Sequence, residues 1–327
     1  MSPGEFLAAH GFGDARRIPL AGDASFRAYE RLEGGPYPAL LMLCPPGRET
    51  LAPFLRLASL IRGYGLSAPH VYAADEAAGL ALVEDFGDDT FTRLLNRGED
   101  EGELYRLAAA ALVALHRRYP PQDLPAWGPK EMTEAAAATV FDWWWPAVFG
   151  GPATDDLRRS FAEAVAETLA PFGEDEPVLV HRDFHVDNLV RLPRPGVAAC
   201  GLLDFQDAAS GHPAYDVVSL LEDARRDVSE AARRTALALY LDEAAVSDRS
   251  RFLAALAAHA ALRHARVAAL WTRLARRDGK RGYLRFGPRT WRLLERALAD
   301  PACRPLAAWF DRNIPPRLRR TPEEATP

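Results

Sequence analysis

The most constraining feature of the sequence is a change of pattern near residue 85. The first 85 residues predict short apolar strands around one helix, in the order strand, strand, strand, helix, strand, strand. From residue 91 onward, alanine-rich segments with apolar residues at helical spacing predict long helices, interrupted by three brief apolar strands. The pattern therefore predicts an α+β chain with a small, mixed, strand-rich lobe at 1–84 and a mainly helical lobe at 85–327.

Individual elements follow from the same periodicities. A helix is expected to begin at Ser2, where Pro3 and Glu5 complete a capping box. Strands are expected at 18–32 (a hairpin), 38–44, 68–73, 80–84, 177–180, 189–192 and 201–205. Further helices are expected at 51–64, 104–119, 132–149, 155–169, 229–240 and 251–276. The tail from residue 321 is polar and bounded by proline, and it is expected to be disordered.

Composition limits the classes of function. The 327 residues carry a net charge of −5, which argues against the electrostatic grip that nucleic-acid binding requires. The three cysteines, Cys44, Cys200 and Cys303, are too far apart in sequence to suggest a disulfide framework or a metal-ligand pair. No apolar run approaches the roughly 20 residues that span a bilayer, and the N-terminus lacks a signal-peptide pattern. We therefore expect a cytoplasmic, monomeric protein with no nucleic-acid or membrane partner.

Polar residues are concentrated after two of the brief strands in the helical half. The first segment is His181-Arg182-Asp183-Phe184-His185-Val186-Asp187-Asn188, and the second is Asp204-Phe205-Gln206-Asp207. Acids at the ends of buried strands are costly unless they bind protons, cations or hydrogen-bond donors. Two acids and an amide that converge from neighbouring strand ends predict a site for Mg²⁺ and phosphate, since Mg²⁺ takes a few oxygen ligands and shares substrate phosphates.

The same residues supply what phosphoryl transfer requires. Asp183 is the candidate base, a carboxylate that orients the nucleophilic hydroxyl and accepts its proton. Asn188 and Asp204 are the candidate metal ligands, an amide oxygen and a second carboxylate that hold Mg²⁺ against a triphosphate.

These segments resemble known kinases. The stretch His181–Asn188 resembles the catalytic loop of protein kinases, and Asp204-Phe205-Gln206 resembles the metal-binding triplet that follows it. With Gly211-His212-Pro213-Ala214-Tyr215-Asp216, the match is closer to the aminoglycoside phosphotransferase and choline kinase family. Within that family the chain resembles bacterial anomeric N-acetylmuramate and N-acetylglucosamine kinases, at 22–27, 84–88, 141–145 and 277–280.

The resemblance covers nearly the whole chain and implies a fold and an activity. The implied fold is protein-kinase-like and two-lobed. The implied reaction transfers the γ-phosphoryl group of ATP, with Mg²⁺, to the anomeric C1 hydroxyl of an amino sugar in cell-wall recycling. Asp216 is expected to brace the catalytic loop, and its position before an apolar helix also predicts a helix N-cap.

The resemblance also indicates where the nucleotide binds. The turn Gly22-Asp23-Ala24-Ser25 offers small residues that let backbone N–H groups approach the phosphates. Backbone groups at Glu84 and Phe86, in the connection between lobes, are expected to bind adenine. One departure is clear: the third strand of such lobes carries a lysine for the phosphates, whereas here Met42 is expected at that position. Arg27, Arg48 or two Mg²⁺ ions are candidates to replace its charge.

Candidates for the acceptor side are less specific. Asp142 lies within Phe141-Asp142-Trp143-Trp144-Trp145, where at least one tryptophan is expected in the core. His185 and Asp207 are further candidates near the substrate, although each also fits a structural role. His259, Arg263 and Arg266 share one helix face and suit the lactyl carboxylate of N-acetylmuramate, but the same pattern fits a solvated face.

Three other hypotheses remain open at this stage. Choline, an amino alcohol or an aminoglycoside is an alternative acceptor. A metal-dependent hydrolase is a second hypothesis. It is suggested by four residues at every second position, which would share one face of a strand as metal ligands can: His181, Asp183, His185 and Asp187. A nucleotide-binding pseudokinase is a third, suggested by the missing lysine.

Overall fold

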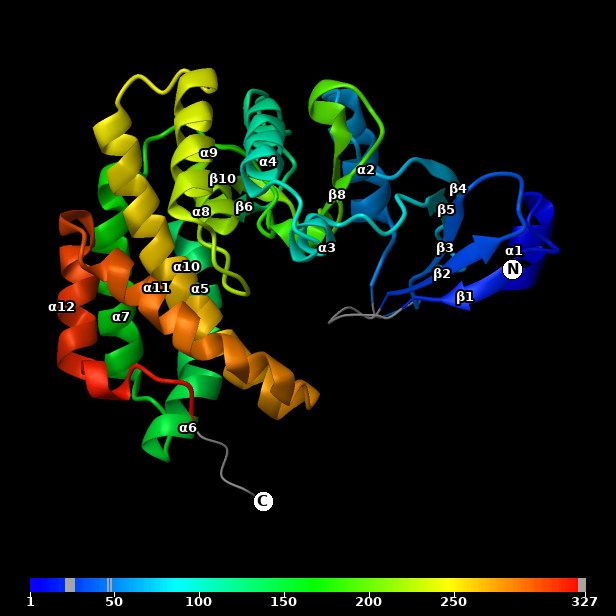
Figure 1. Ribbon diagram of the computed structural model, residues 1–327. Helices are drawn as coiled ribbons and strands as arrows, with labels where there is room; N and C mark the ends of the chain where they lie inside the picture. The colour runs from blue at the N-terminus through cyan, green and yellow to red at the C-terminus, as the bar shows by residue number, and fades with distance from the viewer. Residues whose placement is uncertain (21–26, 46, 48, 323–327) are drawn as a thin grey trace. The chain divides into compact units, whose positions relative to one another are not determined.

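The computed structural model describes residues 1–20, 27–45, 47 and 49–322. Its contacts divide the chain into two compact units (Figure 1). The first unit combines Met1–Leu115 with His185–Ala208, and the second combines His116–Phe184 with Ala209–Pro327. These units group residues by contact, so the predicted lobe boundary at residue 84 stays a prediction.

The first unit is built on a five-stranded antiparallel sheet in the order β1-β2-β3-β5-β4. The strands are β1 (Arg16–Pro19), β2 (Ala28–Glu33), β3 (Ala39–Leu43), β4 (Val71–Asp75) and β5 (Leu80–Glu84). The predicted hairpin is confirmed, because β1 pairs with β2 in antiparallel register. The interior strand β5 is buried over its first four residues, as expected where a strand has neighbours on both sides.

Helix α1 (Pro3–Ala9) covers part of this sheet. Its predicted capping box is present, since the Glu5 N–H donates to Ser2 Oγ and Glu5 Oε2 accepts from the Ser2 N–H at 2.8 Å. Phe6 of α1 packs in one apolar cluster with Leu41 of β3 and Leu82 of β5, and all three are almost fully buried. Burial of one helix face against the sheet therefore fixes α1.

The described residues of the first unit also form three helices and a hairpin from later in the chain. The helices are α2 (Ala52–Gly63), α3 (Phe91–Asn96) and α4 (Glu101–His116), which ends one residue into the second unit. The hairpin pairs β8 (Leu189–Arg191) with β9 (Cys200–Leu202), preceded by the 3₁₀ turn η3 (Val186–Asn188) and containing η4 (Gly196–Ala199). Ser67 and Gly201 form a parallel bridge that links this hairpin to the segment after α2.

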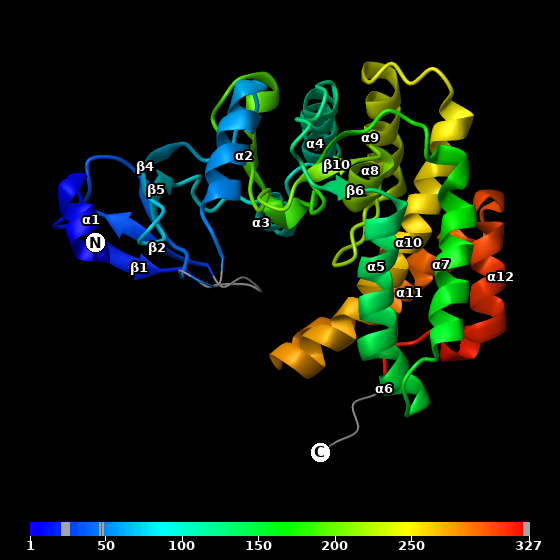
Figure 2. The ribbon, with the colours of Figure 1, turned by 180° about the vertical axis from the view of Figure 1, so that it is seen from behind.

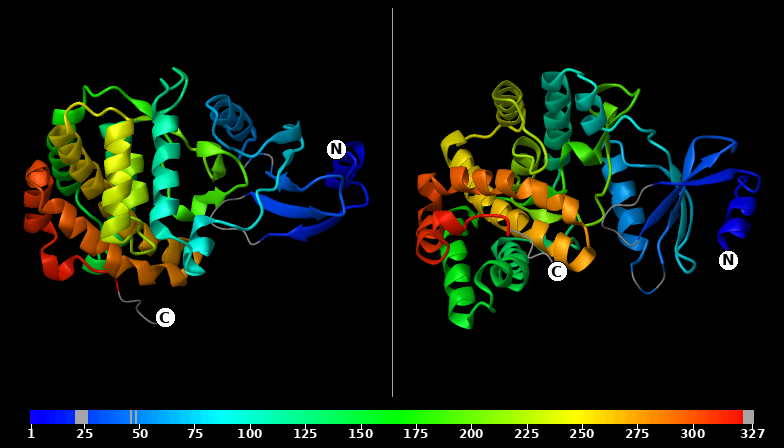
Figure 3. Two further views of the ribbon diagram at one scale, coloured as in Figure 1. Left: turned by 45° about the horizontal axis from the view of Figure 1, so that its top comes forward. Right: turned by 60° about the horizontal axis from the view of Figure 1, so that its bottom comes forward.

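The second unit is mainly helical (Figure 2). Its α-helices are α5 (Pro129–Thr139), α6 (Trp145–Phe149), α7 (Asp155–Leu169), α8 (Ala214–Leu221), α9 (Glu230–Glu243), α10 (Arg249–Asp278), α11 (Gly287–Leu298) and α12 (Arg304–Asn313). Short turns lie at η2 (Ala170–Phe172), η5 (Arg281–Phe286), η6 (Pro301–Cys303) and η7 (Pro316–Leu318). Helix α10 is 30 residues long and packs along α11 and α5, and α12 packs along α7 (Figure 3).

The predicted helix at 132–149 is continuous but changes type. Between α5 and α6 the chain forms a π-helical segment, η1 (Val140–Trp144), in which the Trp145 N–H bonds the Val140 carbonyl. Pro146, which follows, has no N–H to continue an α-helical ladder. Single π-turns of this kind are frequent at functional sites.

A three-stranded sheet lies within the second unit in the order β6-β10-β7. Its strands are β6 (Ala126–Trp127), β7 (Val178–Val180) and β10 (Ala209–Gly211), with β10 parallel to β6 and antiparallel to β7. The chain is 55% helical and 13% strand, which confirms the α+β class. None of the helices in the described part of the chain combines the length and apolar character needed to span a bilayer.

Candidate active site

The loop that follows β7 is held by two backbone hydrogen bonds to a buried carboxylate. The His181 N–H donates to Asp216 Oδ2 at 2.5 Å, and the Arg182 N–H donates to Asp216 Oδ1 at 2.9 Å. Asp216 is fully buried in the first turn of α8. The predicted N-cap role of Asp216 is wrong, because Pro213 holds the cap position and the carboxylate binds the loop instead. The expectation that Asp216 braces this loop is confirmed.

The Asp216 carboxylate contacts buried His116, which in turn contacts buried Tyr240. His116 Nε2 lies 3.4 Å from Asp216 Oδ2, and His116 Nδ1 lies 2.8 Å from the Tyr240 hydroxyl oxygen. Burial raises the pKa of Tyr240, so its hydroxyl keeps its proton at neutral pH. The ends of α4 and α9 thus fix the carboxylate that anchors the loop.

Arg182 has a strained backbone and a stacked side chain. Its φ of 74° lies in the left-handed region, which costs a non-glycine residue of order 1–3 kcal/mol. Its guanidinium carbon lies 3.8 Å from the ring centroid of Trp127 at the end of β6, a cation–π contact that offsets part of this cost. The strain and the two hydrogen bonds to Asp216 together set the direction in which the chain enters Asp183.

Asp183 is half-buried between two fixed neighbours. Phe184, the next residue, is fully buried, and its ring meets the edge of the His181 ring at 5.6 Å. The backbone on both sides of Asp183 is therefore held, which limits the positions that its carboxylate reaches. A base for a bound hydroxyl needs this kind of fixed placement.

The two predicted metal ligands lie at the same end of the β8–β9 hairpin. Leu189 pairs with Leu202, and the Leu203 N–H donates to the Asn188 carbonyl oxygen at 2.9 Å, which extends the pairing to the residue before Asp204. Asp204 is exposed. One amide and one carboxylate are oxygen donors that Mg²⁺ accepts, so the chemistry and placement of these residues fit a magnesium site.

Asp204 lies beyond its strand and not at the end of it. The predicted strand 201–205 is too long, because β9 ends at Leu202 and Asp204 has a left-handed φ of 59°. Gln206 Nε2 donates to Asp204 Oδ1 at 2.7 Å, which orients the carboxylate. Phe205 is buried and stacks on Phe54 of α2 with ring centroids 5.2 Å apart. The turn therefore buries Phe205 and leaves Asp204 accessible.

Asp187 is tied to a neighbouring helix, and His185 is a buried residue of the same loop. His185 is buried, and Asp187 Oδ1 accepts a short hydrogen bond from the Thr92 hydroxyl of α3. Residues 181–185 have no strand structure, since β7 ends at Val180. The alternation that suggested a metal-dependent hydrolase therefore does not place these side chains on one strand face.

The predicted nucleotide contacts are only partly described. Gly22, Asp23, Ala24 and Ser25 lie outside the described residues. Glu84 ends β5, and its N–H donates to the His70 carbonyl oxygen at 2.8 Å.

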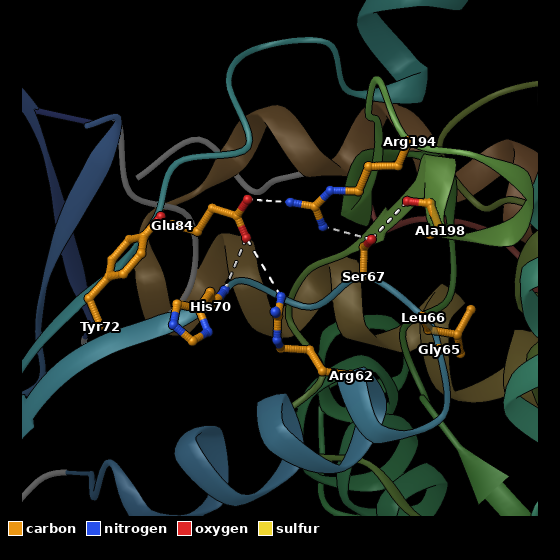
Figure 4. A pocket seen from close by; sticks show the side chains of 9 residues that line it. All are labelled: Arg62, Gly65, Leu66, Ser67, His70, Tyr72, Glu84, Arg194 and Ala198. Carbon is orange, nitrogen blue, oxygen red and sulfur yellow. Dashed lines mark hydrogen bonds and ion pairs between the residues drawn. The ribbon is translucent and has the colours of Figure 1, made fainter.

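The Glu84 side chain faces a cavity of about 500 Å³ within the first unit (Figure 4). Its carboxylate accepts a short hydrogen bond from Arg194 and lies 3.8 Å from Arg62 Nη1. The guanidinium carbon of Arg194 lies 5.4 Å from the ring centroid of Phe86. The Phe86 ring also packs closely on Gly201, because a Cβ added to Gly201 would lie 2.8 Å from that ring. Side chains at Glu84 and Phe86 are thus engaged within the unit.

Met42 occupies an apolar site on β3. It is fully buried and pairs across the sheet with Tyr29 of β2 and Ala81 of β5. A buried thioether supplies no positive charge, so the charge that a lysine would bring must come from another residue or from bound metal.

The acceptor-side candidates have mixed environments. Asp142 is exposed on η1, and its Oδ1 accepts from Arg158 Nη2 of α7 at 2.7 Å. Trp144 is fully buried, which confirms a core tryptophan, and its Nε1–H donates to the Arg320 carbonyl oxygen. Asp207 is exposed after the Asp204 turn. Nothing described links Asp142 or Asp207 to a ligand, so both remain predictions.

The face of α10 that carries His259, Arg263 and Arg266 is not a solvated face. His259 is buried and donates to the Ala255 carbonyl oxygen, and burial lowers its pKa to about 3, so it is neutral. Arg263 is 5% exposed, and its buried Nη1 has no hydrogen-bond partner among the described residues. Arg266 Nη1 donates to the Tyr215 hydroxyl at 3.4 Å.

Arg266 also connects α10 to the loop. Its guanidinium carbon lies 5.9 Å from the ring centroid of Trp127, the ring on which Arg182 stacks. Trp127, His116 and Tyr240 were not singled out from the sequence. Each lies more than 50 residues from the loop in sequence, and no local motif signals such contacts.

Comparison with known proteins identifies relatives of this chain. The model of the phosphotransferase enzyme family matches residues 16–253. An N-acetylmuramate/N-acetylglucosamine kinase of Caulobacter vibrioides is 40% identical, with 96% of each chain covered. The enzyme of the same name from Pseudomonas aeruginosa is 33% identical over 90% of this chain and 88% of its own length.

Solved structures show the same fold at low sequence identity. A choline/ethanolamine kinase family protein from Mesorhizobium loti superposes with a TM-score of 0.60 at 14% identity, covering 91% of this chain and 93% of that chain. The GDP complex of aminoglycoside 2'-phosphotransferase-IIIa gives a TM-score of 0.59 at 16% identity, covering 87% of this chain and 92% of that chain. These likenesses confirm the predicted protein-kinase-like fold. With most of its length matched by the family model and by these relatives, the chain belongs to the phosphotransferase enzyme family.

Proposed function

We propose that the chain is an ATP- and Mg²⁺-dependent sugar kinase that phosphorylates the anomeric C1 hydroxyl of N-acetylmuramate and N-acetylglucosamine. The observation that carries the acceptor is the 40% identity, over 96% of both chains, to a relative that bears this name. Three further relatives at 30–33% identity bear the same name. The proposed setting is the cytoplasm, where a monomer acts on sugars released from the cell wall.

Each loop residue has a defined role in this proposal. Asp183 orients the C1 hydroxyl and takes its proton as the oxygen bonds the γ-phosphorus, while ADP leaves with the bridging oxygen. Asn188 and Asp204 hold Mg²⁺, which supplies positive charge to the phosphate oxygens when bound. Asp216 keeps the backbone before Asp183 in place through its two accepted hydrogen bonds. In-line transfer depends mainly on such positioning and charge.

The nucleotide side is proposed to lie along the sheet of the first unit. Backbone groups at Glu84 and Phe86 bind adenine, and the turn at Gly22, Asp23, Ala24 and Ser25 covers the phosphates. On the acceptor side, Asp142, His185 and Asp207 remain the proposed contacts of the sugar. For N-acetylmuramate, the proposed contacts of the lactyl carboxylate are Arg263 and Arg266. His259 is excluded from this role because it is buried and neutral.

The direct test is a product analysis with a panel of acceptors. The purified protein is incubated with ATP, Mg²⁺ and one of N-acetylmuramate, N-acetylglucosamine, choline, ethanolamine or kanamycin. Phosphorus NMR of the product then distinguishes a sugar 1-phosphate from a 6-phosphate through coupling to the anomeric proton. We expect the 1-phosphate with both amino sugars. A 6-phosphate would overturn the regiochemistry, and turnover only with choline, ethanolamine or kanamycin would overturn the sugar acceptor.

A further inference from the structure

The missing strand lysine leaves a specific question, namely which group supplies its charge. In kinases of this fold, the lysine of the third strand is held by a glutamate of the helix that follows the strand. Here Met42 is buried on β3 and carries no charge. Of the two candidate arginines, Arg48 lies outside the described residues, and Arg27 lies directly before β2.

Strand register places Arg27 on the same sheet face as Met42. Ala28 pairs with Leu43 and Tyr29 with Met42, so Arg27 lies opposite Cys44, one step further along the two strands. Directly opposed residues share a face, and so do residues two apart on one strand. The side chains of Arg27, Tyr29, Met42 and Cys44 therefore stand on one face of the sheet.

Arg27 is paired with a glutamate in the way that the family lysine is. Its Nε lies 2.7 Å from Glu49 Oε2, with the two side chains 9% and 25% exposed. Glu49 lies three residues before α2, the helix that follows β3. The ion pair thus joins this face of the sheet to the segment just before the same helix, with the cation moved from β3 to the residue before β2.

Tyr29 responds to the charges of both Arg27 and Asp204. Burial raises the pKa of Tyr29, and the positive charge of Arg27 opposes this shift while the negative charge of Asp204 adds to it. The charges of both groups therefore act on one phenol. Arg27 and the candidate metal ligand Asp204 lie within the same unit.

We propose that Arg27, positioned by Glu49, binds the phosphates of the nucleotide in place of the absent lysine on β3. This inference rests on the proposed kinase function and names the residue that completes its charge. A guanidinium offers several N–H donors in a planar fork, a geometry that suits phosphate oxygens as well as a carboxylate such as Glu49.

Binding measurements test this assignment without relying on turnover. The dissociation constants of ATP, ADP and adenosine are measured by calorimetry in the presence of Mg²⁺ for the wild type and for Arg27→Met. Loss of a charge-assisted phosphate contact is expected to weaken the affinity for ATP and ADP about 10- to 100-fold. The affinity for adenosine is expected to change less than about 2-fold. Arg27→Lys keeps the charge and is expected to retain most of the ATP affinity.

Matched variants separate a phosphate contact from a general effect on the sheet. Arg17→Met removes a second arginine that is paired with a glutamate, Glu30, across β1 and β2, and it is expected to leave all three affinities unchanged. Glu49→Gln removes the charge that positions Arg27 and is expected to weaken the affinity for ATP about 3- to 10-fold. Adding Met42→Lys to Arg27→Met returns a cation to β3 and is expected to recover at least half of the lost affinity on a logarithmic scale.

The outcomes are decisive in both directions. Unchanged ATP affinity in Arg27→Met, or equal weakening of ATP and adenosine, would overturn the inference and leave the kinase proposal intact. An absence of recovery in the double variant would overturn the equivalence of the two positions. If the wild type bound neither ATP nor ADP, the nucleotide part of the proposed function itself would fail.

Discussion

At the scale of single residues, the proposed chemistry depends most directly on Asp183. Asp183→Asn keeps the shape of the side chain but removes the proton acceptor, so kcat is expected to fall at least about 100-fold. Nucleotide affinity is expected to change little, because Asn188 and Asp204 are untouched. Steady-state kinetics and calorimetry measure the two effects, with the exposed Asp14→Asn as control. Full activity in Asp183→Asn would place the base elsewhere.

Asp216 allows a second prediction, on stability and activity together. Asp216→Ala leaves the buried acceptor site of the His181 and Arg182 N–H groups empty, and each unsatisfied N–H costs about 1–3 kcal/mol. The free energy of unfolding in urea is expected to fall accordingly, and kcat is expected to fall because the loop loses its anchor. An Asp216→Ala protein with wild-type stability would contradict the bracing role.

The residues that could be read from the sequence are those that share a local motif. Asp183, Asn188 and Asp216 stand in recognisable motifs, and the spacing of those motifs supported the hypothesis of a kinase. Tyr240 contacts His116 from 124 positions away, and the contact exists only because α4 and α9 pack near α8. Such partners depend on tertiary packing, which a single sequence does not display.

At the scale of elements, long periodic segments were predicted well and short ones were not. The bounds of α7 agree with the prediction, and α10 extends it by two residues at each end. Helices α11 and α12 were missed, because glycine and prolines at 287–288, 301 and 305 interrupt the apolar pattern at their starts. The strands β6 and β10 are too short to produce an alternating pattern at all.

The contact between the end of α8 and α10 predicts acid sensitivity. Burial alone raises the pKa of Glu222, but the hydrogen bond from His264 and the charges of Arg296 and Arg233 outweigh it and lower the pKa from 4.5 to about 2. The unfolded chain therefore binds a proton that the folded chain does not, between about pH 4.5 and 2. Stability from this group is present above pH 4.5 and is lost as the pH falls through that window.

Buried His264 also makes the folded protein less stable as the pH falls, because burial lowers the pKa of His264 below the usual 6.5. Urea unfolding at several pH values between 3 and 7 measures the effect. The wild type is expected to lose on the order of 3 kcal/mol of unfolding free energy between pH 4.5 and 2 through this group. Glu222→Gln is expected to make the unfolding free energy depend less on pH below 4.5. Exposed Glu134→Gln serves as control. An equal slope in both variants would show that other groups govern acid unfolding.

The arginines of α10 predict how the two proposed sugars are distinguished. Arg266→Gln removes a positive charge that lies beside Trp127, and thus near the loop residue Arg182. The KM for N-acetylmuramate is expected to rise about 10-fold, the scale of one lost charge-assisted contact, and the KM for N-acetylglucosamine less than about 2-fold. The exposed Arg276→Gln on the same helix is the control. Parallel changes with both sugars would argue against a carboxylate contact.

At the scale of the whole molecule, ligand binding is expected to raise thermal stability. ATP at 100 times its dissociation constant adds about 2.7 kcal/mol to the unfolding free energy. Because Asn188 and Asp204 are proposed to hold the metal, removal of Mg²⁺ with EDTA is expected to abolish most of the gain. Thermal unfolding with ATP, with and without Mg²⁺, measures this for the wild type and Asp204→Ala. A Mg²⁺-dependent shift that survives in Asp204→Ala would exclude this residue as a ligand.

The class of fold and the family were both accessible from the sequence, because the order of elements and the motif spacing act over the whole chain. The lobe boundary at residue 84 was read from the change of pattern alone. Contacts instead group the β8–β9 hairpin with the N-terminal sheet, since Ser67 bridges to Gly201 and Phe54 stacks on Phe205. Pairing between such distant segments leaves no trace in local periodicity.

The polypeptide passes from one unit to the other three times, after Leu115, Phe184 and Ala208. A gene fragment that ends at residue 115 consequently encodes a sheet without the hairpin that carries Asn188 and Asp204, and no single cut yields two complete halves. The middle passage falls inside the His181–Asn188 segment, so only five peptide links join the proposed base to the proposed metal ligand. Five residues reach at most about 18 Å even when fully stretched, and this short tether limits how far the two groups can ever separate.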